Sequence, residues 1–182
     1  GDTLGLISQL NDLGSTYSSK SDYDTALRYY FESLKLCEVI GMQRGISVNL
    51  GNIGLAYFEL DEDEKALEFY QRALEINEEL DNENSLATNY NNIGLLHGDE
   101  GRYEEALEYH FKALELRREL GYTLRIANSL NNIGRVYMQQ DKHAQALEYL
   151  QKALEVNSGE DQNLSSIIHE NVTKTYISSG SY

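Results

Sequence analysis

The sequence predicts an all-α fold, a solenoid of antiparallel helix pairs with four complete pairs and one further helix. Three observations lead to this prediction. A Leu-Gly or Ile-Gly pair recurs every forty residues, at Leu13-Gly14, Ile53-Gly54, Ile93-Gly94 and Ile133-Gly134. An Ala-Leu pair recurs at the same spacing, at Ala26-Leu27, Ala66-Leu67, Ala106-Leu107 and Ala146-Leu147. The chain contains no proline. A period of this length is typical of arrays of stacked helix pairs that share a continuous core.

Each period divides into a first helix, here called the A helix, and a second, the B helix. The A helices are predicted at about 3–19, 44–60, 84–99, 124–140 and 163–178. The B helices are predicted at about 22–40, 63–80, 103–120 and 143–157. The repeats therefore cover about 3–40, 44–80, 84–120 and 124–157 within a single predicted domain, 1–182. Because the chain opens with Gly1-Asp2, we expect a fragment of a longer protein.

The second repeat shows how the sequence marks its helices. Ala66, Tyr70 and Ala73 follow the spacing of one helix face. Carboxylates stand near the starts of most B helices, where they suit the positive end of the helix dipole, at Asp24, Glu64, Glu104 and Glu105. Helix ends are expected where residues tolerate a left-handed backbone, at Gly41, Asp81-Asn82 and Gly121.

Small residues at fixed phases predict how the helices pack. Gly54 in the A helix has no Cβ and allows a neighbouring helix to approach closely. Ala66 and Ala73 in the B helix allow the same approach. The space between the helices is then filled by larger residues, such as Tyr57, Phe69, Tyr70 and Leu74.

The chain is strongly acidic. It has 30 Asp and Glu residues against 15 Lys and Arg residues, a formal net charge of -15. Such a surface repels phosphate backbones and anionic lipid headgroups, so neither nucleic acid nor a membrane is expected as a partner. No apolar run approaches the roughly 18 residues needed to span a bilayer. No signal peptide or lipidation motif is visible, although the loss of a leader stays open.

Cys37 is the single cysteine, so the chain has no internal disulfide. A lone thiol favours a reducing compartment, and a cytoplasmic location is the prediction. The residues one, two and three periods after Cys37 are all polar, namely Asn77, Arg117 and Asn157. Cys37 is therefore expected at a partly exposed helix position.

The residues at these phases resemble the tetratricopeptide repeat. In that family a large apolar residue, Leu-Gly, Tyr, Ala, an aromatic residue and Ala follow at set spacings. The second repeat reads Leu50, Ile53-Gly54, Tyr57, Ala66, Tyr70 and Ala73. The third reads Tyr90, Ile93-Gly94, His97, Ala106, His110 and Ala113. The fourth reads Leu130, Ile133-Gly134, Tyr137, Ala146, Leu150 and Ala153. The first departs most, with Ser33 in place of the last Ala. The resemblance covers nearly the whole chain and implies a right-handed superhelical solenoid.

Two departures from the family pattern are visible. The usual proline near the end of the B helix is missing, and the period is forty residues rather than the basic thirty-four. Forty-residue versions are similar to the repeats of kinesin light chain, of an adaptor built from Leu-Gly-Asn repeats and of bacterial signalling proteins. The resemblance implies a non-catalytic scaffold that binds a protein or an extended peptide segment.

A column of asparagines is expected on one face of the A helices. Leu50, Ile53 and Gly54 share the packed side of their helix. At the helical step of about 100° per residue, Asn52 points roughly 150° away from that side. Its equivalents are Asp12, Asn92, Asn132 and Asn171. Asn is several tenths of a kcal/mol worse than Glu or Lys as a helix former, so the column indicates a function.

The functional interpretation is an asparagine ladder. A carboxamide offers a donor and an acceptor, which match the N–H and C=O of an extended backbone. Adjacent A helices should lie on the order of 10 Å apart, a span that an extended peptide covers in about three residues. We therefore expect the column, with Asn131 beside Asn132, to hold a peptide main chain. Two alternatives stay open: the asparagines bridge adjacent A helices, or they face water.

Residues next to the column would set the specificity. The residues that directly follow the repeat glycines are Ser15, Leu55, Leu95 and Arg135. Lys174 is the equivalent residue in the last A helix, where the interval is one residue shorter. This pattern predicts a ligand with an apolar side chain over the two leucines and a carboxylate near the two cations. The alternative is that Arg135 pairs with Asp99 or Gln139 nearby.

No residue pattern indicates catalysis. The four histidines are scattered, and His97 and His110 stand at aromatic core positions. No H-E-x-x-H, paired Cys, phosphate-binding loop or nucleophile elbow is present. We therefore expect no enzyme, no cofactor and no metal. Two other functions stay open: self-association through the exposed solenoid ends, and a sensory module of a larger signalling protein.

Overall fold

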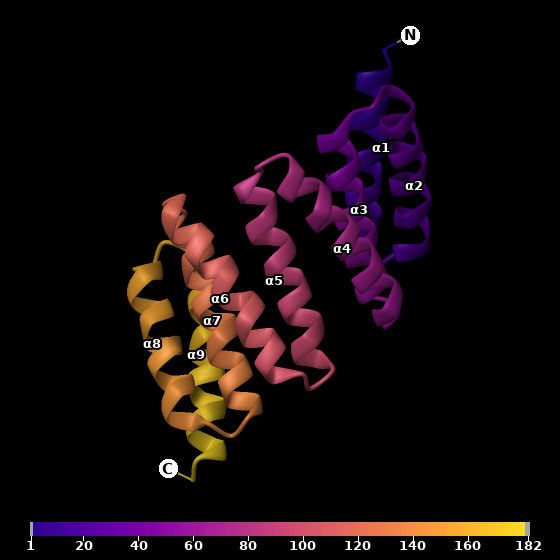
Figure 1. Ribbon diagram of the computed structural model, residues 1–182. Coiled ribbons are helices and arrows are strands. Elements are labelled where there is room, and N and C mark those ends of the chain that lie inside the picture. The colour runs from indigo at the N-terminus through magenta and orange to yellow at the C-terminus, as the bar shows by residue number, and fades with distance from the viewer. Residues whose placement is uncertain (1, 181–182) are drawn as a thin grey trace. The chain divides into compact units, whose positions relative to one another are not determined.

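A computed structural model describes residues 2–180 (Figure 1). In this range the chain forms nine α-helices and no strand: α1 (Thr3–Ser18), α2 (Tyr23–Ile40), α3 (Gln43–Phe58), α4 (Asp63–Glu79), α5 (Glu83–Asp99), α6 (Tyr103–Glu119), α7 (Thr123–Gln139), α8 (His143–Asn157) and α9 (Gln162–Ser178). The predicted fold class, four helix pairs and one further helix, is confirmed. Every predicted boundary lies within two residues of the observed one. Along residues 2–180, no helix combines the length and the apolar character that crossing a membrane requires.

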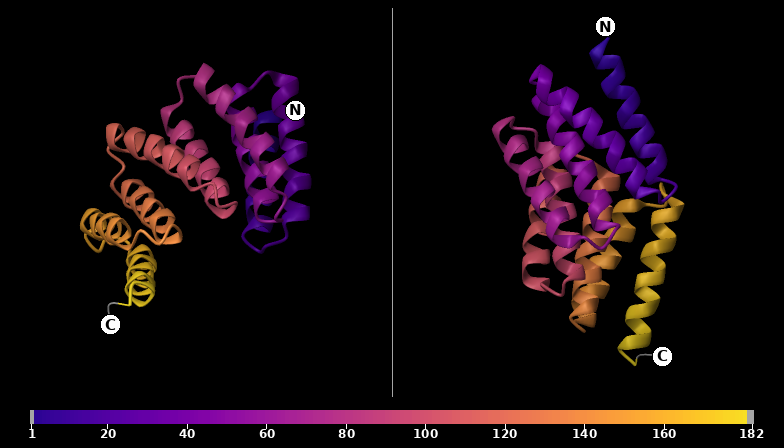
Figure 2. Two further views of the ribbon diagram at one scale, coloured as in Figure 1. Left: turned by 60° about the horizontal axis from the view of Figure 1, so that its bottom comes forward. Right: turned by 90° about the vertical axis from the view of Figure 1, so that its right-hand side faces the viewer.

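The chain divides into two compact units, residues 1–92 and 93–182, and the division falls within α5. In the first unit α1 packs on α2, α2 on α3, and α3 on α4 (Figure 1). In the second unit α6 packs on α7, α7 on α8, and α9 on both α7 and α8 (Figure 2). A single domain over the whole chain stays a prediction.

Left-handed residues stand at the helix ends, as the sequence predicts. Gly41, Asp81 and Gly121 have φ values of 68°, 48° and 72°. Carboxylates occupy the first turns of α2, α4 and α6. Asp22 also caps α2, because its side chain accepts a hydrogen bond from the Thr25 N–H at 3.2 Å. These local signals explain why the predicted boundaries agree closely with the structure.

Each repeat packs the glycine of its A helix against a side chain of its B helix. A Cβ added to Gly54 would lie 2.6 Å from Cδ1 of the buried Tyr70 ring. The equivalent contacts join Gly14 to Tyr30, Gly94 to His110 and Gly134 to Leu150. The first alanine of the B-helix pattern is fully buried in every repeat, at Ala26, Ala66, Ala106 and Ala146. The predicted close approach of the two helices is therefore confirmed.

The prediction that Cys37 is partly exposed is wrong. Cys37 is fully buried, and burial is the main cause that raises the pKa of its thiol. Its polar equivalents are buried as well, at Asn77, Arg117 and Asn157. Each bonds to the A helix of the next repeat: Asn49 Nδ2 to Cys37 Sγ at 3.7 Å, Asn77 Nδ2 to Asn89 Oδ1 at 2.9 Å, Arg117 Nη1 to Ser129 Oγ at 2.6 Å, and Asn157 Nδ2 to Ser165 Oγ at 2.7 Å. A buried polar group is tolerated when it is hydrogen-bonded in this way.

Candidate functional site

Three of the predicted peptide-binding residues lie in the first unit. Asn52 and Leu55 are on α3, and Asn92 is on α5. Asn52 and Asn92 are half-buried. Within residues 2–180 neither of these two carboxamides forms a hydrogen bond. Leu55 is 39% exposed. These side chains are therefore available to a partner.

The second unit contains a small hollow, here called the α5–α7 hollow. It is lined by residues of three helices: Gly94, Leu95, Gly98 and Asp99 of α5, His110 of α6, and Asn132, Arg135, Val136 and Gln139 of α7. The structure thus brings together Leu95, Asn132 and Arg135, three of the residues that the sequence predicts to bind peptide. Its volume is about 10 Å³, space for about one water molecule. It is far too small for a cofactor.

Arg135 supplies a positive charge to this hollow. Its side chain is half-buried, and Asp99 and Gln139 line the same hollow. Within the part of the chain that the structure describes, the guanidinium forms no ion pair or hydrogen bond with either of them. The guanidinium therefore keeps its donors available, and in so acidic a chain an unpaired half-buried cation is a place for an anionic group.

His110 forms part of the wall of the hollow, which sequence reasoning did not predict. Its predicted core position is confirmed, since it is only 1% exposed. Burial, and after it the positive charges of Arg117 and Arg135, lowers the pKa of His110 to about 3. The ring is therefore neutral at physiological pH. Its Nδ1 atom has no hydrogen-bond partner within residues 2–180.

The sequence does contain a signal for this hollow. The His110 position holds Tyr in the first two repeats, at Tyr30 and Tyr70. Gly98 stands where the second and fourth repeats have Phe58 and Met138. Both residues of the third repeat are smaller than their equivalents in the second, Tyr70 and Phe58, and both line the hollow.

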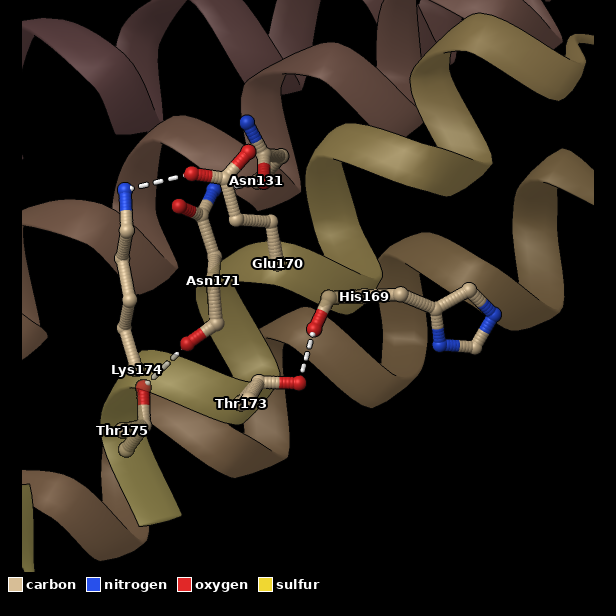
Figure 3. A network of polar contacts seen from close by, with 7 residues as sticks. All are labelled: Asn131, His169, Glu170, Asn171, Thr173, Lys174 and Thr175. Atoms are coloured by element: carbon tan, nitrogen blue, oxygen red, sulfur yellow. Dashed lines mark hydrogen bonds and ion pairs between the residues drawn. The ribbon is translucent and has the colours of Figure 1, made fainter. Parts of the chain in front are cut away.

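Asn131 and Asn171 are placed differently from Asn52 and Asn92, which are half-buried. They are 4% and 6% exposed, and Asn171 Nδ2 donates a 2.9 Å hydrogen bond to Asn131 Oδ1. Figure 3 shows Asn171 of α9 beside Asn131 of α7. The backbone carbonyl of Asn171 accepts a further hydrogen bond from Thr175 Oγ1 at 2.8 Å. For this pair the structure matches the alternative in which asparagines bridge adjacent A helices.

Lys174 is exposed on α9 and is already paired. Its Nζ lies 2.7 Å from the Glu170 carboxylate, one turn earlier on the same helix (Figure 3). Such a pair on the surface contributes little to stability, but it offsets the lysine charge. Of the two predicted cations, Arg135 is therefore the stronger candidate for an anionic ligand. In the described residues no group of three or more His, Cys, Asp or Glu side chains could hold a metal ion.

Comparisons with known proteins agree with this architecture. The tetratricopeptide repeat model matches residues 6–79 and again residues 85–158. No curated protein matches the chain. Among solved structures, BtubC (BKLC) from P. vanneervenii is 23% identical, with a TM-score of 0.84 over 98% of this chain and 74% of that one.

Two further groups of structures have the same fold. A putative kinesin light chain from Podosopora anserina with nearly identical repeats is 12% identical, with a TM-score of 0.78 over 96% of this chain and 87% of that one. A Rap protein complexed with Competence and Sporulation Factor is 17% identical, with a TM-score of 0.86 over 97% of this chain. This chain covers 53% of that Rap protein and 47% of RapI. The two family matches cover well over half of the sequence, and the chain belongs to the tetratricopeptide repeat family.

Proposed function

We propose that this chain is a non-catalytic scaffold that holds an extended peptide. The carboxamides of Asn52, Asn92 and Asn132 would bond to the peptide main chain, beside the apolar surface of Leu55 and Leu95. A carboxylate of the ligand would bond to Arg135. The observation that carries the proposal is the guanidinium of Arg135, which has no ion pair or hydrogen bond within residues 2–180 and lies in a hollow shared with Leu95 and Asn132.

The comparisons support a binding role. One structure with this fold is a Rap protein in complex with Competence and Sporulation Factor, so the fold can hold a partner. We propose the same for this chain, with an acidic peptide as the partner. Affinity in the micromolar range is expected, since a net gain of about 0.5–1.5 kcal/mol per hydrogen bond is offset by ordering a flexible peptide. A cytoplasmic location stays a prediction.

A peptide-library pulldown tests the asparagines. The variant Asn92→Ala with Asn132→Ala removes two carboxamides that would each contribute about 0.5–1.5 kcal/mol to binding. We expect the double variant to retain far fewer peptides than the wild type. Asn128→Ala is the matched control, because Asn128 is exposed on α7 and bonds to the Leu124 carbonyl of its own helix at 3.0 Å. Equal recovery by the double variant and the wild type would contradict the ladder.

Replacing Arg135 tests the charge. Arg135→Glu is expected to weaken an acidic peptide by about tenfold or more, since a hydrogen bond to a charged group contributes about 1.5–3 kcal/mol. Titration calorimetry with a peptide recovered from the library measures the loss. Lys35→Glu on α2 makes the same change in net charge at an exposed position. If both variants lose affinity equally, the effect comes from net charge and not from a site at Arg135.

Self-association is a second candidate function, favoured by exposed apolar residues on the first and last helices. Leu4 on α1 is 60% exposed and Ile177 on α9 is 62% exposed. Terminal repeats without a polar outer face tend to associate. Sedimentation velocity over a wide concentration range measures this. A mass that stays that of one chain throughout the range would exclude it.

A further inference from the structure

Gly51 lies in the interior of α3, and the packing of the described residues does not require a glycine there. Apart from proline, glycine is the poorest helix former. Other helix glycines make room for a neighbour: a Cβ added to Gly54 would lie 2.6 Å from Tyr70, and one added to Gly45 would lie 2.6 Å from Cys37 Sγ. A Cβ added to Gly51 would meet nothing within 4 Å. Gly51 therefore weakens its helix without a compensating contact within residues 2–180.

The other three repeats have asparagine at this position, at Asn11, Asn91 and Asn131. Two of these asparagines connect their helix to a neighbouring one. Asn11 Nδ2 donates a hydrogen bond to Ser33 Oγ at 2.8 Å, and Asn131 Oδ1 accepts one from Asn171 Nδ2 at 2.9 Å. A glycine can form no such side-chain bond. Because α3 gives up both helix propensity and a contact between helices, we infer that the space over Gly51 has a use.

Two exposed apolar side chains flank this space. Val48 and Leu55 are 50% and 39% exposed. They stand three residues before and four residues after Gly51, spacings at which residues lie on the same face of a helix. At the Val48 position the other repeats have polar residues, Ser8, Thr88 and Asn128. In α3 a missing side chain and two apolar neighbours thus coincide on one face. We call Val48, Gly51 and Leu55 the α3 notch.

The chemistry of the α3 notch fits one aliphatic side chain. Val48 and Leu55 offer it no charge and no hydrogen-bonding group, so a charged side chain would lose hydration without gaining a partner. An aliphatic side chain would instead remove apolar surface from water. Asn52 directly follows Gly51 and is half-buried, and its carboxamide forms no hydrogen bond within residues 2–180. A peptide residue whose main chain bonds to Asn52 can therefore place its side chain over Gly51.

Resting on the proposed function, we propose that the α3 notch is a subsite for one branched aliphatic residue of the bound peptide, such as leucine, and that Gly51 determines its specificity. The side chain lies over the backbone of Gly51, between Val48 and Leu55. Neither Val48 nor Gly51 is among the residues that the proposed function uses. The other repeats cannot form the same subsite, since an asparagine occupies the Gly51 position in α1, α5 and α7.

Two peptide libraries that differ only at one central residue test the subsite. One has Leu at that position, and the other has Asn, which is similar in shape but polar. Wild-type protein should prefer the Leu library by about tenfold, as expected for burial of an aliphatic side chain. Gly51→Asn introduces the residue of the other repeats and should remove the preference, while peptides still bind. Val48→Ser should reduce the preference. Leu4→Ser removes another exposed apolar side chain, on α1, and should leave it unchanged.

Urea unfolding separates a binding role of Gly51 from a folding role. Gly51→Ala should raise the unfolding midpoint, because alanine is the better helix former and nothing stands within 4 Å of its Cβ. The same variant should weaken the preference for the Leu library, because its methyl group occupies part of the notch. A lower midpoint would show that the fold itself needs the glycine, and would overturn the inference.

The outcomes also separate this inference from the proposed function. If the wild type binds both libraries equally, or if the Leu preference survives Gly51→Asn, the subsite is wrong and peptide binding stands. If neither library is retained, the proposed function fails and the subsite fails with it. If Gly51→Asn changes the mass in sedimentation but not the binding of either library, a second copy of the chain occupies the notch, and its assignment to a peptide is wrong.

Discussion

Gly54→Ala is expected to destabilise the first unit by up to about 2 kcal/mol, because overpacking a core costs about 1–3 kcal/mol and the helix gains about 1 kcal/mol when its glycine is replaced. The new Cβ would lie 2.6 Å and 2.7 Å from Cδ1 and Cε1 of Tyr70, and 3.2 Å from the Ala66 carbonyl oxygen. Tyr70 is buried, and Ala66 is held by its helix. Neither can move away without disturbing its neighbours. This cost exceeds the gain of about 1 kcal/mol from replacing glycine within a helix.

The same helix provides a matched control. Gly51 also lies in α3, but nothing stands within 4 Å of an added Cβ. Gly51→Ala should therefore stabilise the protein by about 0.5–1 kcal/mol through helix propensity alone. Urea unfolding followed by circular dichroism measures both variants. If the two substitutions shift stability in the same direction, Gly54 is not required for the close approach of α3 and α4.

Acid should destabilise the second unit through His110. The pKa of His110 is lowered to about 3 in the folded chain, first by burial and then by Arg117 and Arg135. An unfolded histidine has a pKa of about 6.5. Below about pH 6.5 the unfolded state therefore binds a proton that the folded state does not bind, and stability falls as the pH falls. Between about pH 7.5 and about pH 4.5 we expect this group alone to remove about 2–3 kcal/mol.

The variant His110→Tyr isolates this contribution. Tyrosine does not titrate in the acid range, and Tyr30 and Tyr70 occupy the equivalent core position in the first two repeats. The variant should lose less stability on acidification than the wild type, by about 2–3 kcal/mol over the same range. Denaturant unfolding at a series of pH values gives both slopes. Burial also lowers the pKa of His97. Its effect on the pH dependence of stability is the same in the variant and the wild type, so it cancels in the comparison. Equal slopes for His110→Tyr and the wild type would mean that the folded ring takes up protons freely.

Most of the fold could be predicted because its signals are local and repeated. The spacing of Ala66, Tyr70 and Ala73 depends only on helical geometry, and the turn residues Gly41, Asp81 and Gly121 depend only on backbone conformation. The contact between Gly54 and Tyr70 follows from side-chain volume, because a glycine leaves room for the large tyrosine ring. Such features need no knowledge of distant parts of the chain, and four copies of each pattern confirm one another.

The candidate site could be predicted only in part. Arg135 and Leu95 were predicted as neighbours from their phase in the repeat, and they line one hollow. Asn171 has the same phase as Asn132 but is buried against Asn131. The interval between the fourth A helix and the last one is one residue shorter than the forty-residue period. The repeat pattern alone therefore does not show which face of α9 lies against α7.

By itself, the sequence determined that this protein is an array of paired helices, because period, propensity and side-chain volume act over short distances along the chain. Only the tertiary structure decided which polar residues are buried and which remain available. Cys37 and Arg117 occupy equivalent positions of their repeats, and the sequence predicts exposure to solvent there. Both are buried because partners on the next helix bond to them. Arg135 is half-buried and keeps its donors available because no partner among the described residues 2–180 bonds to it. The difference is set by the group that stands opposite in space, which a repeat pattern alone does not contain.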